Sequence, residues 1–158
     1  MEKFSCQYRA YLEDTDAGGI VYHANHIRFF DRARTEWLRA RDLVEMRKQF
    51  NYHFVIRHID IKYHRPIKID DLMTVTAGVH SINGTYFVAS QELIVNGKAM
   101  ASAKFDITLI DGNTMRPIHI PEDLLTELLK DQAVHNPAGI GLNSIKAKAV
   151  PVADAVAV

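Results

Sequence analysis

The chain has 158 residues, and its 19 Lys and Arg balance 19 Asp and Glu, so the formal net charge is zero with histidine neutral. Hydrophobic residues make up 47% and charged residues 24%, which is typical of a globular protein and excludes a disordered or fibrous chain. A chain without net charge has no overall field to hold nucleic acid or an anionic membrane, so we expect neither as a partner.

The only cysteine is Cys6, which excludes an intrachain disulfide framework. No apolar signal-peptide core follows the first residues, and no apolar run approaches the about 20 residues that a membrane-spanning helix needs. We therefore expect a soluble, cytoplasmic protein without an integral membrane segment. Cys6 alternates with apolar residues and is expected in the core.

An alternating strand opens the chain. Its apolar face consists of Phe4, Cys6, Tyr8, Ala10 and Leu12. It ends at residues 13–19, a stretch of turn formers with three carboxylates. The next segment, from about Asn25 to Arg41, predicts a long helix with one broad apolar face, and Asn25 is its candidate N-cap. That face contains Phe30, Ala33, Trp37 and Ala40, which we interpret as core packing.

Four further strands are predicted by alternation, at Phe54–His64, Leu72–Val79, Tyr86–Val95 and Lys98–Ile110. The last three are separated by Asn83-Gly84 and Asn96-Gly97. This dipeptide suits two-residue hairpin turns because both positions tolerate positive φ. Two such turns in succession predict an antiparallel meander.

The end of the chain changes character. Pro121, at a first helical position beside Glu122 and Asp123, predicts a short second helix. From Asp131 onward the chain is rich in Ala and Val with scattered Pro and Gly. We therefore expect a domain over residues 1–130 and a weakly structured tail over residues 131–158.

The order of these elements predicts an α+β fold, in which an antiparallel sheet curls around one central helix. One helix covers only one face of the sheet. We therefore expect the remaining face or edge to meet another subunit in a homo-oligomer, either a dimer or a tetramer.

The segment 13–25 is the strongest candidate for chemistry. Its glycines let the backbone approach a ligand, and free N–H groups at the helix start favour developing negative charge. A carboxylate beside such a site can act as a nucleophile or a base. The alternative is a loop whose acids only cap backbone N–H groups.

The residues of this segment also resemble a known family, the hotdog-fold acyl-CoA thioesterases. The motif runs Asp14-Thr15-Asp16-Ala17-Gly18-Gly19, then Tyr22-His23-Ala24-Asn25, and on through the helix from Phe29 to Leu38. The match is closest to the subgroup associated with the Tol–Pal cell-envelope system and more distant to 4-hydroxybenzoyl-CoA thioesterase. The resemblance implies a curved antiparallel sheet wrapped around one long central helix, and hydrolysis of acyl-CoA to a carboxylic acid and CoA.

The resemblance also assigns roles to individual residues. Asp16 matches the catalytic carboxylate of the family, as nucleophile or general base. His23 occupies the histidine position of the motif, and its backbone N–H would polarise the thioester oxygen. Tyr22 and Asn25 are expected to line the substrate site, whereas Asp14 is expected to bond loop amides.

The phosphates of CoA need cations. The basic stretch 57–68 offers Lys62, Arg65 and Lys68, and Arg116 fits the C-terminal pattern of the subgroup. The alternative for the basic stretch is a solvated strand face.

Three rival interpretations remain. His23 and His26 invite a metal site, but zinc usually needs three or four converging ligands, so we expect no metal and no cofactor beyond the CoA of the substrate. A non-catalytic module that binds acyl chains or acyl carrier protein is the main alternative function, and that carrier is also an alternative thioester donor. Hydratase chemistry on the same fold is weaker. The presence of Asp16 favours the enzyme.

Overall fold

The computed structural model describes residues 2–140 and 156–157, and this part of the chain contains six strands and three α-helices. The strands are β1 (Phe4–Arg9), β2 (Tyr52–Tyr63), β3 (Leu72–Asn83), β4 (Tyr86–Val95), β5 (Lys98–Asp111) and the two-residue β6 (Val156–Ala157). The helices are α1 (Asn25–Arg39), α2 (Leu43–Phe50) and α3 (Glu122–His135), with 3-10 turns η1 (Leu12–Asp14) and η2 (Pro137–Ile140).

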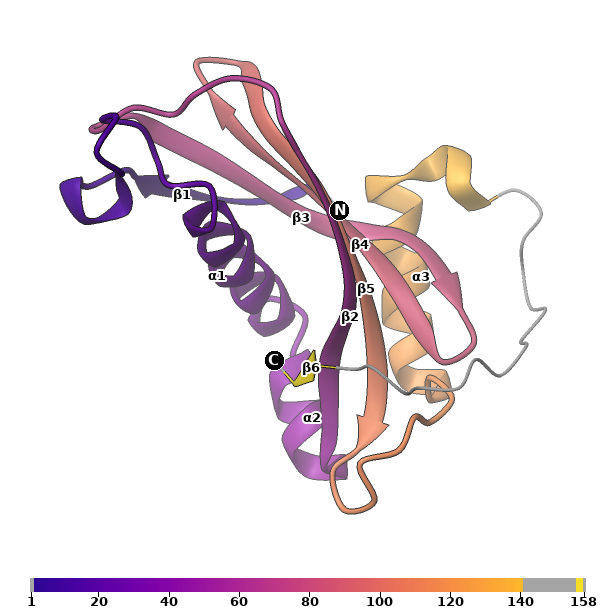
Figure 1. The fold of residues 1–158 in the computed structure, drawn as a ribbon. Helices are drawn as coiled ribbons and strands as arrows, with labels where there is room; N and C mark the ends of the chain where they lie inside the picture. The colour runs from indigo at the N-terminus through magenta and orange to yellow at the C-terminus, as the bar shows by residue number, and fades with distance from the viewer. Residues whose placement is uncertain (1, 141–155, 158) are drawn as a thin grey trace.

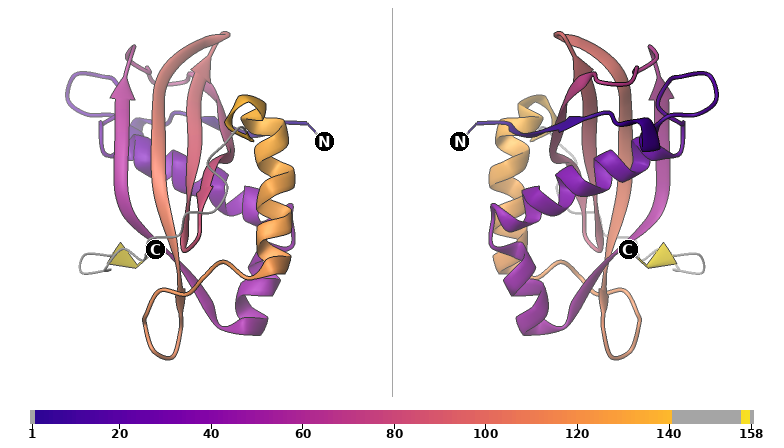
Figure 2. Two further views of the ribbon diagram at one scale, coloured as in Figure 1. Left: turned by 90° about the vertical axis from the view of Figure 1, so that its right-hand side faces the viewer. Right: turned by 90° about the vertical axis from the view of Figure 1, so that its left-hand side faces the viewer.

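The strands form one antiparallel sheet in the order β1-β3-β4-β5-β2-β6, and the sheet is not closed. The sheet is curved, with α1 against one face and α3 on the other side (Figures 1 and 2). This arrangement confirms the predicted α+β fold with one long helix against the sheet.

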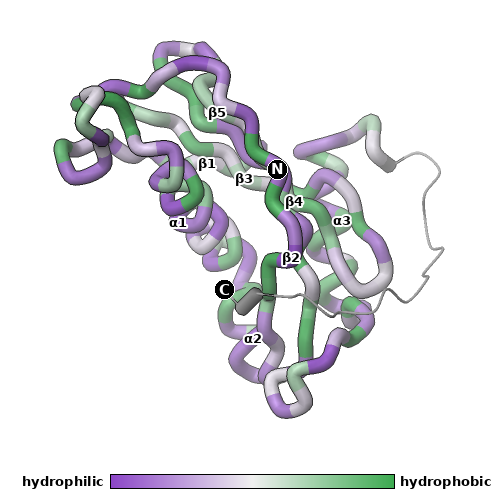
Figure 3. Tube along the Cα trace, in the orientation of Figure 1, coloured by the Kyte–Doolittle hydropathy of each residue, from purple (hydrophilic) through white to green (hydrophobic). Residues whose placement is uncertain are grey.

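Helix α1 packs its apolar face on the sheet, as its periodicity predicts. Phe30 meets Phe105 of β5 with ring centroids 5.7 Å apart, and Trp37 meets Phe87 of β4 at 6.2 Å. Both helix residues are almost completely buried, and the alternation of apolar and polar residues is visible along α1 and the strands (Figure 3). The helix ends at Arg39 rather than Arg41, three residues before the left-handed backbone of Asp42.

The predicted meander is present, but its first turn lies one residue later than predicted. Asn96 and Gly97 both have positive φ, 50° and 73°, and form the predicted two-residue turn. The first turn is formed by Gly84 and Thr85 instead, because Asn83 still pairs with Tyr86 as the last residue of β3. Alternation alone cannot locate the last paired residue of a strand.

Cys6 is only partly buried, against our expectation of a core position, because β1 is an edge strand of the sheet. Burial still raises the pKa of its thiol. Helix α2 was not predicted. Its flanking residues Asp42 and Asn51 are both left-handed, and Leu43 is its one buried residue, so neither a conventional cap nor an apolar stripe marks it in the sequence.

Helix α3 begins at Glu122 with Pro121 as its N-cap, one residue later than predicted, and continues to His135, past residue 130 where we expected the domain to end. Asp131 and Gln132 are buried. Residues 141–155 and 158 of the expected tail lie outside the described residues, whereas Val156 and Ala157 pair with Ile56 and Val55 at the edge of β2.

Gly78 of β3 is buried under the end of α3, where the His135 imidazole lies directly over its Cα. A methyl group at this position would overlap the ring, so we expect Gly78→Ala to lower the free energy of unfolding by about 1–3 kcal/mol. Denaturant unfolding measures the change. In a His135→Ala background the same substitution should lower the free energy of unfolding clearly less. Equal losses in both backgrounds would exclude the overlap with His135 as the cause.

Candidate active site

The loop between β1 and α1 folds back on itself as a narrow hairpin. The backbone N–H of Tyr22 donates to the carbonyl of Asp14 at 2.9 Å, and the N–H of Asp16 donates to that of Ile20 at 2.9 Å. A bridge between Thr15 and Val21 lies between these two pairs. The hairpin therefore places the carboxylates of the motif beside the residues that lead into α1.

Asp14 anchors this hairpin. Its Oδ2 accepts the backbone N–H of Tyr11 at 2.8 Å, which closes η1. Its carbonyl oxygen accepts both the N–H of Tyr22 and the side-chain amide of Asn25, each at 2.9 Å. These contacts agree with the structural role expected for Asp14.

Asp16 lies at the tip of the hairpin with an exposed side chain. Its Oδ1 accepts the backbone N–H of Gly18 at 2.7 Å, and its carbonyl oxygen accepts that of Gly19 at 3.1 Å. Gly19 has a φ of 77°, a conformation that favours glycine. Among the described residues Oδ2 has no hydrogen-bond partner. One carboxylate oxygen is thus fixed, while the other is open to a ligand.

Asn25 does not cap α1, contrary to our expectation. The N-cap is Ala24, which has helical backbone angles and no side-chain hydrogen bond. Asn25 is the first helical residue, and its side chain instead ties α1 to Asp14. This bond joins the helix start to a hairpin residue 11 positions earlier in the chain, and the sequence pattern does not predict it.

His23 is exposed, and its ring lies 4.4 Å from that of Tyr22, centroid to centroid. Its carbonyl oxygen accepts the hydroxyl of Tyr63, from the end of β2, at 2.8 Å. Tyr63 also packs edge-on against His26, with ring centroids 4.8 Å apart. The end of β2 therefore belongs to the surroundings of His23.

His26 is 4% exposed, and burial lowers its pKa, so its neutral form is favoured. Its Nδ1 lies 3.2 Å from the carbonyl oxygen of Tyr22. A carbonyl can only accept, so this contact requires the hydrogen on Nδ1. In residues 2–140 and 156–157, no three His, Cys, Asp or Glu side chains gather as a metal site would require.

Two of the predicted cations, Arg65 and Lys68, come from the segment between β2 and β3, part of which pairs with the hairpin. Lys68 forms a bridge with Ile20, and the carbonyl of Ile67 accepts the N–H of Val21 at 2.7 Å, so this segment runs along the hairpin. The Lys68 side chain is exposed. The guanidinium of Arg65 donates to the carbonyl of Ala99 at 2.8 Å, so part of its hydrogen-bonding capacity is used within the fold.

The other two cations lie elsewhere. Lys62 alternates with Tyr63 along β2, and therefore points to the outer face of the sheet, where it lines a shallow polar hollow with Ser102 and Lys104. Arg116 follows β5, near the position where Asp111 pairs with Tyr52. Tyr63 pairs with Ala101 at the other end of β5, about 30 Å away along the strand. Within one chain, neither cation meets the hairpin.

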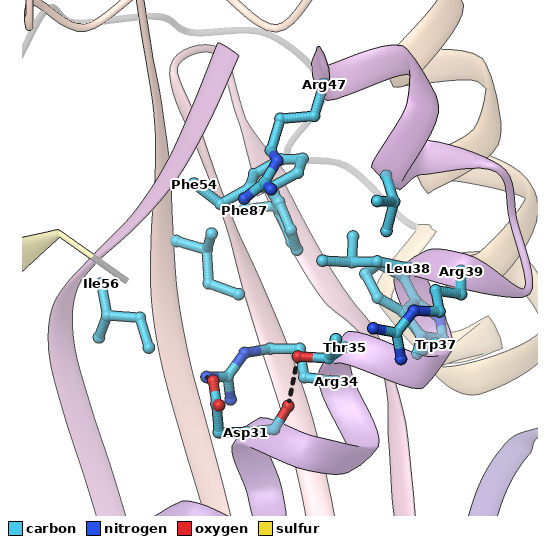
Figure 4. A pocket seen from close by; sticks show the side chains of 12 residues that line it. Asp31, Arg34, Thr35, Trp37, Leu38, Arg39, Arg47, Phe54, Ile56 and Phe87 are labelled. Atoms are coloured by element: carbon cyan, nitrogen blue, oxygen red, sulfur yellow. Dashed lines mark hydrogen bonds and ion pairs between the residues drawn. The ribbon is translucent and has the colours of Figure 1, made fainter. Parts of the chain in front are cut away.

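A groove runs between the C-terminal half of α1, helix α2 and the inner face of the sheet (Figure 4). Its apolar walls include Trp37, Leu38, Val44, Phe54, Ile56, Phe87 and Ile107. Arg34 lies in it with its guanidinium bonded to Gln91 and Asp31, at 2.8 and 3.1 Å. Burial lowers the pKa of Arg34 to about 10.

The sequence motif did not point to His26 or Tyr63 as parts of this site. The alternation along β2 does indicate the direction of Tyr63, because Ile59, Ile61 and Tyr63 share the face of β2 that turns toward α1. His26 lies three residues after His23, in the first turn of α1, and only its burial distinguishes it from a surface histidine. No helix in the described part of the chain is long and apolar enough to cross a membrane.

Comparisons with known proteins agree with this geometry. The family model described as the thioesterase-like superfamily matches residues 11–128. The chain is 35% identical over 123 residues to a Haemophilus influenzae protein named acyl-CoA thioesterase YbgC, covering 77% of this chain and 90% of that protein. It is 32% identical over 126 residues to an Escherichia coli protein named acyl-CoA thioester hydrolase YbgC, covering 78% and 94%.

A solved structure carries the same fold. It is described as a probable thioesterase from Bartonella henselae, is 33% identical, and superposes with a TM-score of 0.65, covering 77% of this chain and all of that chain. Since the family match spans most of the chain, from η1 to the middle of α3, this protein belongs to the thioesterase-like superfamily, whose solved members share the hotdog fold.

Proposed function

We propose that the chain hydrolyses acyl-CoA thioesters, releasing a carboxylic acid and CoA. The observation that carries the proposal is the exposed carboxylate of Asp16, fixed through Oδ1 by the Gly18 N–H at the tip of a hairpin that leads into α1. The names of the curated relatives support the same reaction class.

Thioester hydrolysis needs a nucleophile or base and a donor for the developing oxyanion. In this proposal Asp16 either attacks the thioester carbonyl carbon, expelling the CoA thiolate, or removes a proton from an attacking water. The backbone N–H of His23 donates to the thioester oxygen, and the Tyr22 ring lines the substrate. Asn25 contributes by holding the helix start to the hairpin through Asp14.

Hydrolysis across a panel of acyl-CoA chain lengths, including an aromatic acyl group, tests the proposal, with free thiol as the readout. We expect turnover of at least one acyl-CoA. The alternative is a module that binds acyl-CoA or acyl carrier protein without turnover, and its outcome would be saturable binding of acyl-CoA with no thiol release from any substrate.

Lys68 is the cation that we propose to contact the nucleotide part of CoA, because its side chain is exposed and its backbone pairs with Ile20 of the hairpin. We expect Lys68→Ala to raise the KM for acyl-CoA about fivefold, equivalent to about 1 kcal/mol for one exposed charge contact. The KM for an acyl-pantetheine, which lacks the nucleotide, should stay unchanged. Lys48→Ala in α2 is the control, and an equal rise in KM with both substrates would exclude a nucleotide contact.

We also propose that a second copy of the chain completes the assembly. The side chains of Ile59 and Tyr63, on the inner face of β2, are 36% and 47% exposed in one chain. Exposed apolar residues gathered at a sheet edge are typical of a subunit contact. Light scattering of the purified protein measures the oligomeric state, and a monomer would contradict this proposal.

A further inference from the structure

Both peptide groups that flank His23 are held by side chains from outside the motif. The carbonyl oxygen of Tyr22, in the peptide before His23, accepts the N–H of Asn25 at 2.8 Å and lies 3.2 Å from Nδ1 of His26. The carbonyl oxygen of His23, in the peptide after it, accepts the Tyr63 hydroxyl at 2.8 Å. Neither peptide can rotate without losing one of these bonds.

This arrangement fixes the direction of the His23 N–H. In a trans peptide the N–H is antiparallel to the preceding carbonyl. The Tyr22 carbonyl points into the first turn of α1, toward Asn25 and His26, so the His23 N–H points out of the helix start. Within residues 2–140, this N–H has no hydrogen-bond partner.

The two holding side chains also support each other. His26 is buried, and its ring meets the Tyr63 ring edge-on, with the ring planes at 87°. His26 comes from α1 and Tyr63 from the end of β2, so the backbone at His23 is fixed relative to both the helix and the sheet. A donor held in this way loses little on reorganisation when charge develops on its acceptor.

We propose that His26 and Tyr63 are positioning residues that hold the two peptides flanking His23, so that its N–H is directed at the thioester oxygen. The proposal rests on the proposed function, because it assigns to these side chains the orientation of the oxyanion donor. Donation to a peptide carbonyl also polarises that peptide, which strengthens its own N–H as a donor.

Tyr63→Phe is the first test, because it removes the hydroxyl and keeps the ring against His26. We expect kcat for acyl-CoA hydrolysis to fall about tenfold with KM nearly unchanged, as is typical when an orienting contact is removed. Tyr52→Phe is the matched control, since Tyr52 lies at the opposite end of the same strand. If kcat of Tyr63→Phe equals that of Tyr52→Phe, the proposal is wrong.

His26 allows a rescue experiment. The side-chain amide of asparagine places an N–H donor close to the position of Nδ1, whereas leucine fills the space without a donor. We therefore expect His26→Leu to lower kcat about tenfold and His26→Asn to restore most of it. Equal losses in both variants would mean that His26 acts only by packing, and would contradict the proposal.

Amide hydrogen exchange gives a readout that needs no substrate. In Tyr63→Phe the exchange of the Asn25 amide, which donates to the Tyr22 carbonyl at 2.8 Å, should become at least about tenfold faster, while exchange in β4 and β5 stays unchanged. Unchanged exchange at Asn25 would overturn the positioning role. Faster exchange in Tyr63→Phe, together with a wild-type protein that hydrolyses no acyl-CoA, would retain the positioning of the backbone and reject the proposed function.

Discussion

Asp16→Asn is expected to lower kcat for acyl-CoA hydrolysis by at least about 100-fold, as is typical when a catalytic base or nucleophile is removed. The fold should stay intact for a specific reason. The amide oxygen of asparagine can still accept the Gly18 N–H that Oδ1 now accepts at 2.7 Å, and the side chain is exposed. The substitution therefore removes the charge without removing the turn.

Free-thiol release under saturating acyl-CoA measures the effect, and thermal unfolding checks the fold. Glu13→Gln is the matched control, because it makes the same carboxylate-to-amide change at an exposed position of the same loop. We expect its kcat to remain close to that of the wild type. If Asp16→Asn also keeps wild-type kcat, a different group performs the chemistry.

The two roles open to Asp16 can be separated by a single turnover in oxygen-labelled water with enzyme in excess. If Asp16 attacks the thioester, an anhydride forms, and water that attacks its Asp16 carbonyl leaves label in the aspartate. If Asp16 is a general base, water attacks the thioester carbonyl directly, and all of the label appears in the released acid. Label in the Asp16 peptide would thus require the covalent route.

The second large effect concerns stability. Asp131→Ala is expected to lower the free energy of unfolding by about 3–5 kcal/mol, because it removes one partner of a buried ion pair. Oδ1 of Asp131 accepts the indole N–H of Trp37 at 2.9 Å and also pairs with Arg41. Oδ2 accepts the backbone N–H of Val79 at 2.7 Å. One carboxylate thus joins the end of α1 to the edge of β3 that extends beyond β1.

Denaturant unfolding followed by circular dichroism measures this loss. Asp123→Ala, at an exposed position in the first turn of the same helix, is the control and should cost less than about 1 kcal/mol. Asp131→Asn should also destabilise the protein, because an amide offers one acceptor oxygen where the carboxylate offers two. A change in Asp131→Ala no larger than that of the control would contradict the assigned role.

Local patterns were sufficient for most of the sheet and for α1. Tyr86–Val95 was predicted with its observed bounds, and Asn96-Gly97 adopts the positive φ values that the dipeptide favours. Period-two and period-3.6 patterns succeed here because each of these elements buries one face. Helix α2 buries little beyond Leu43, so it leaves no such pattern.

The residues of the candidate site also fall into two groups, those that the sequence predicts and those that only the fold brings together. The motif located Asp16 and His23 because the turn, its glycines and the helix start are contiguous in the sequence. The contribution of Tyr63 depends on β2 ending beside that helix, 40 residues later in the chain. The predicted cations show that nearness in the sequence does not predict nearness to the site, because Lys62 and Tyr63 are neighbours in the chain but lie on opposite faces of the sheet.

The sequence by itself determined the long strands, helices α1 and α3, the meander and the motif that carries Asp16, since all of these follow from interactions between residues close together in the chain. Only the tertiary structure decided which side chains complete them. Asp131, which composition assigned to a tail, is 2% exposed and pairs with donors from Trp37 of α1, Arg41 after α1 and Val79 of β3. A buried polar group is stable only with its partners, and those partners come from distant segments that folding alone brings together.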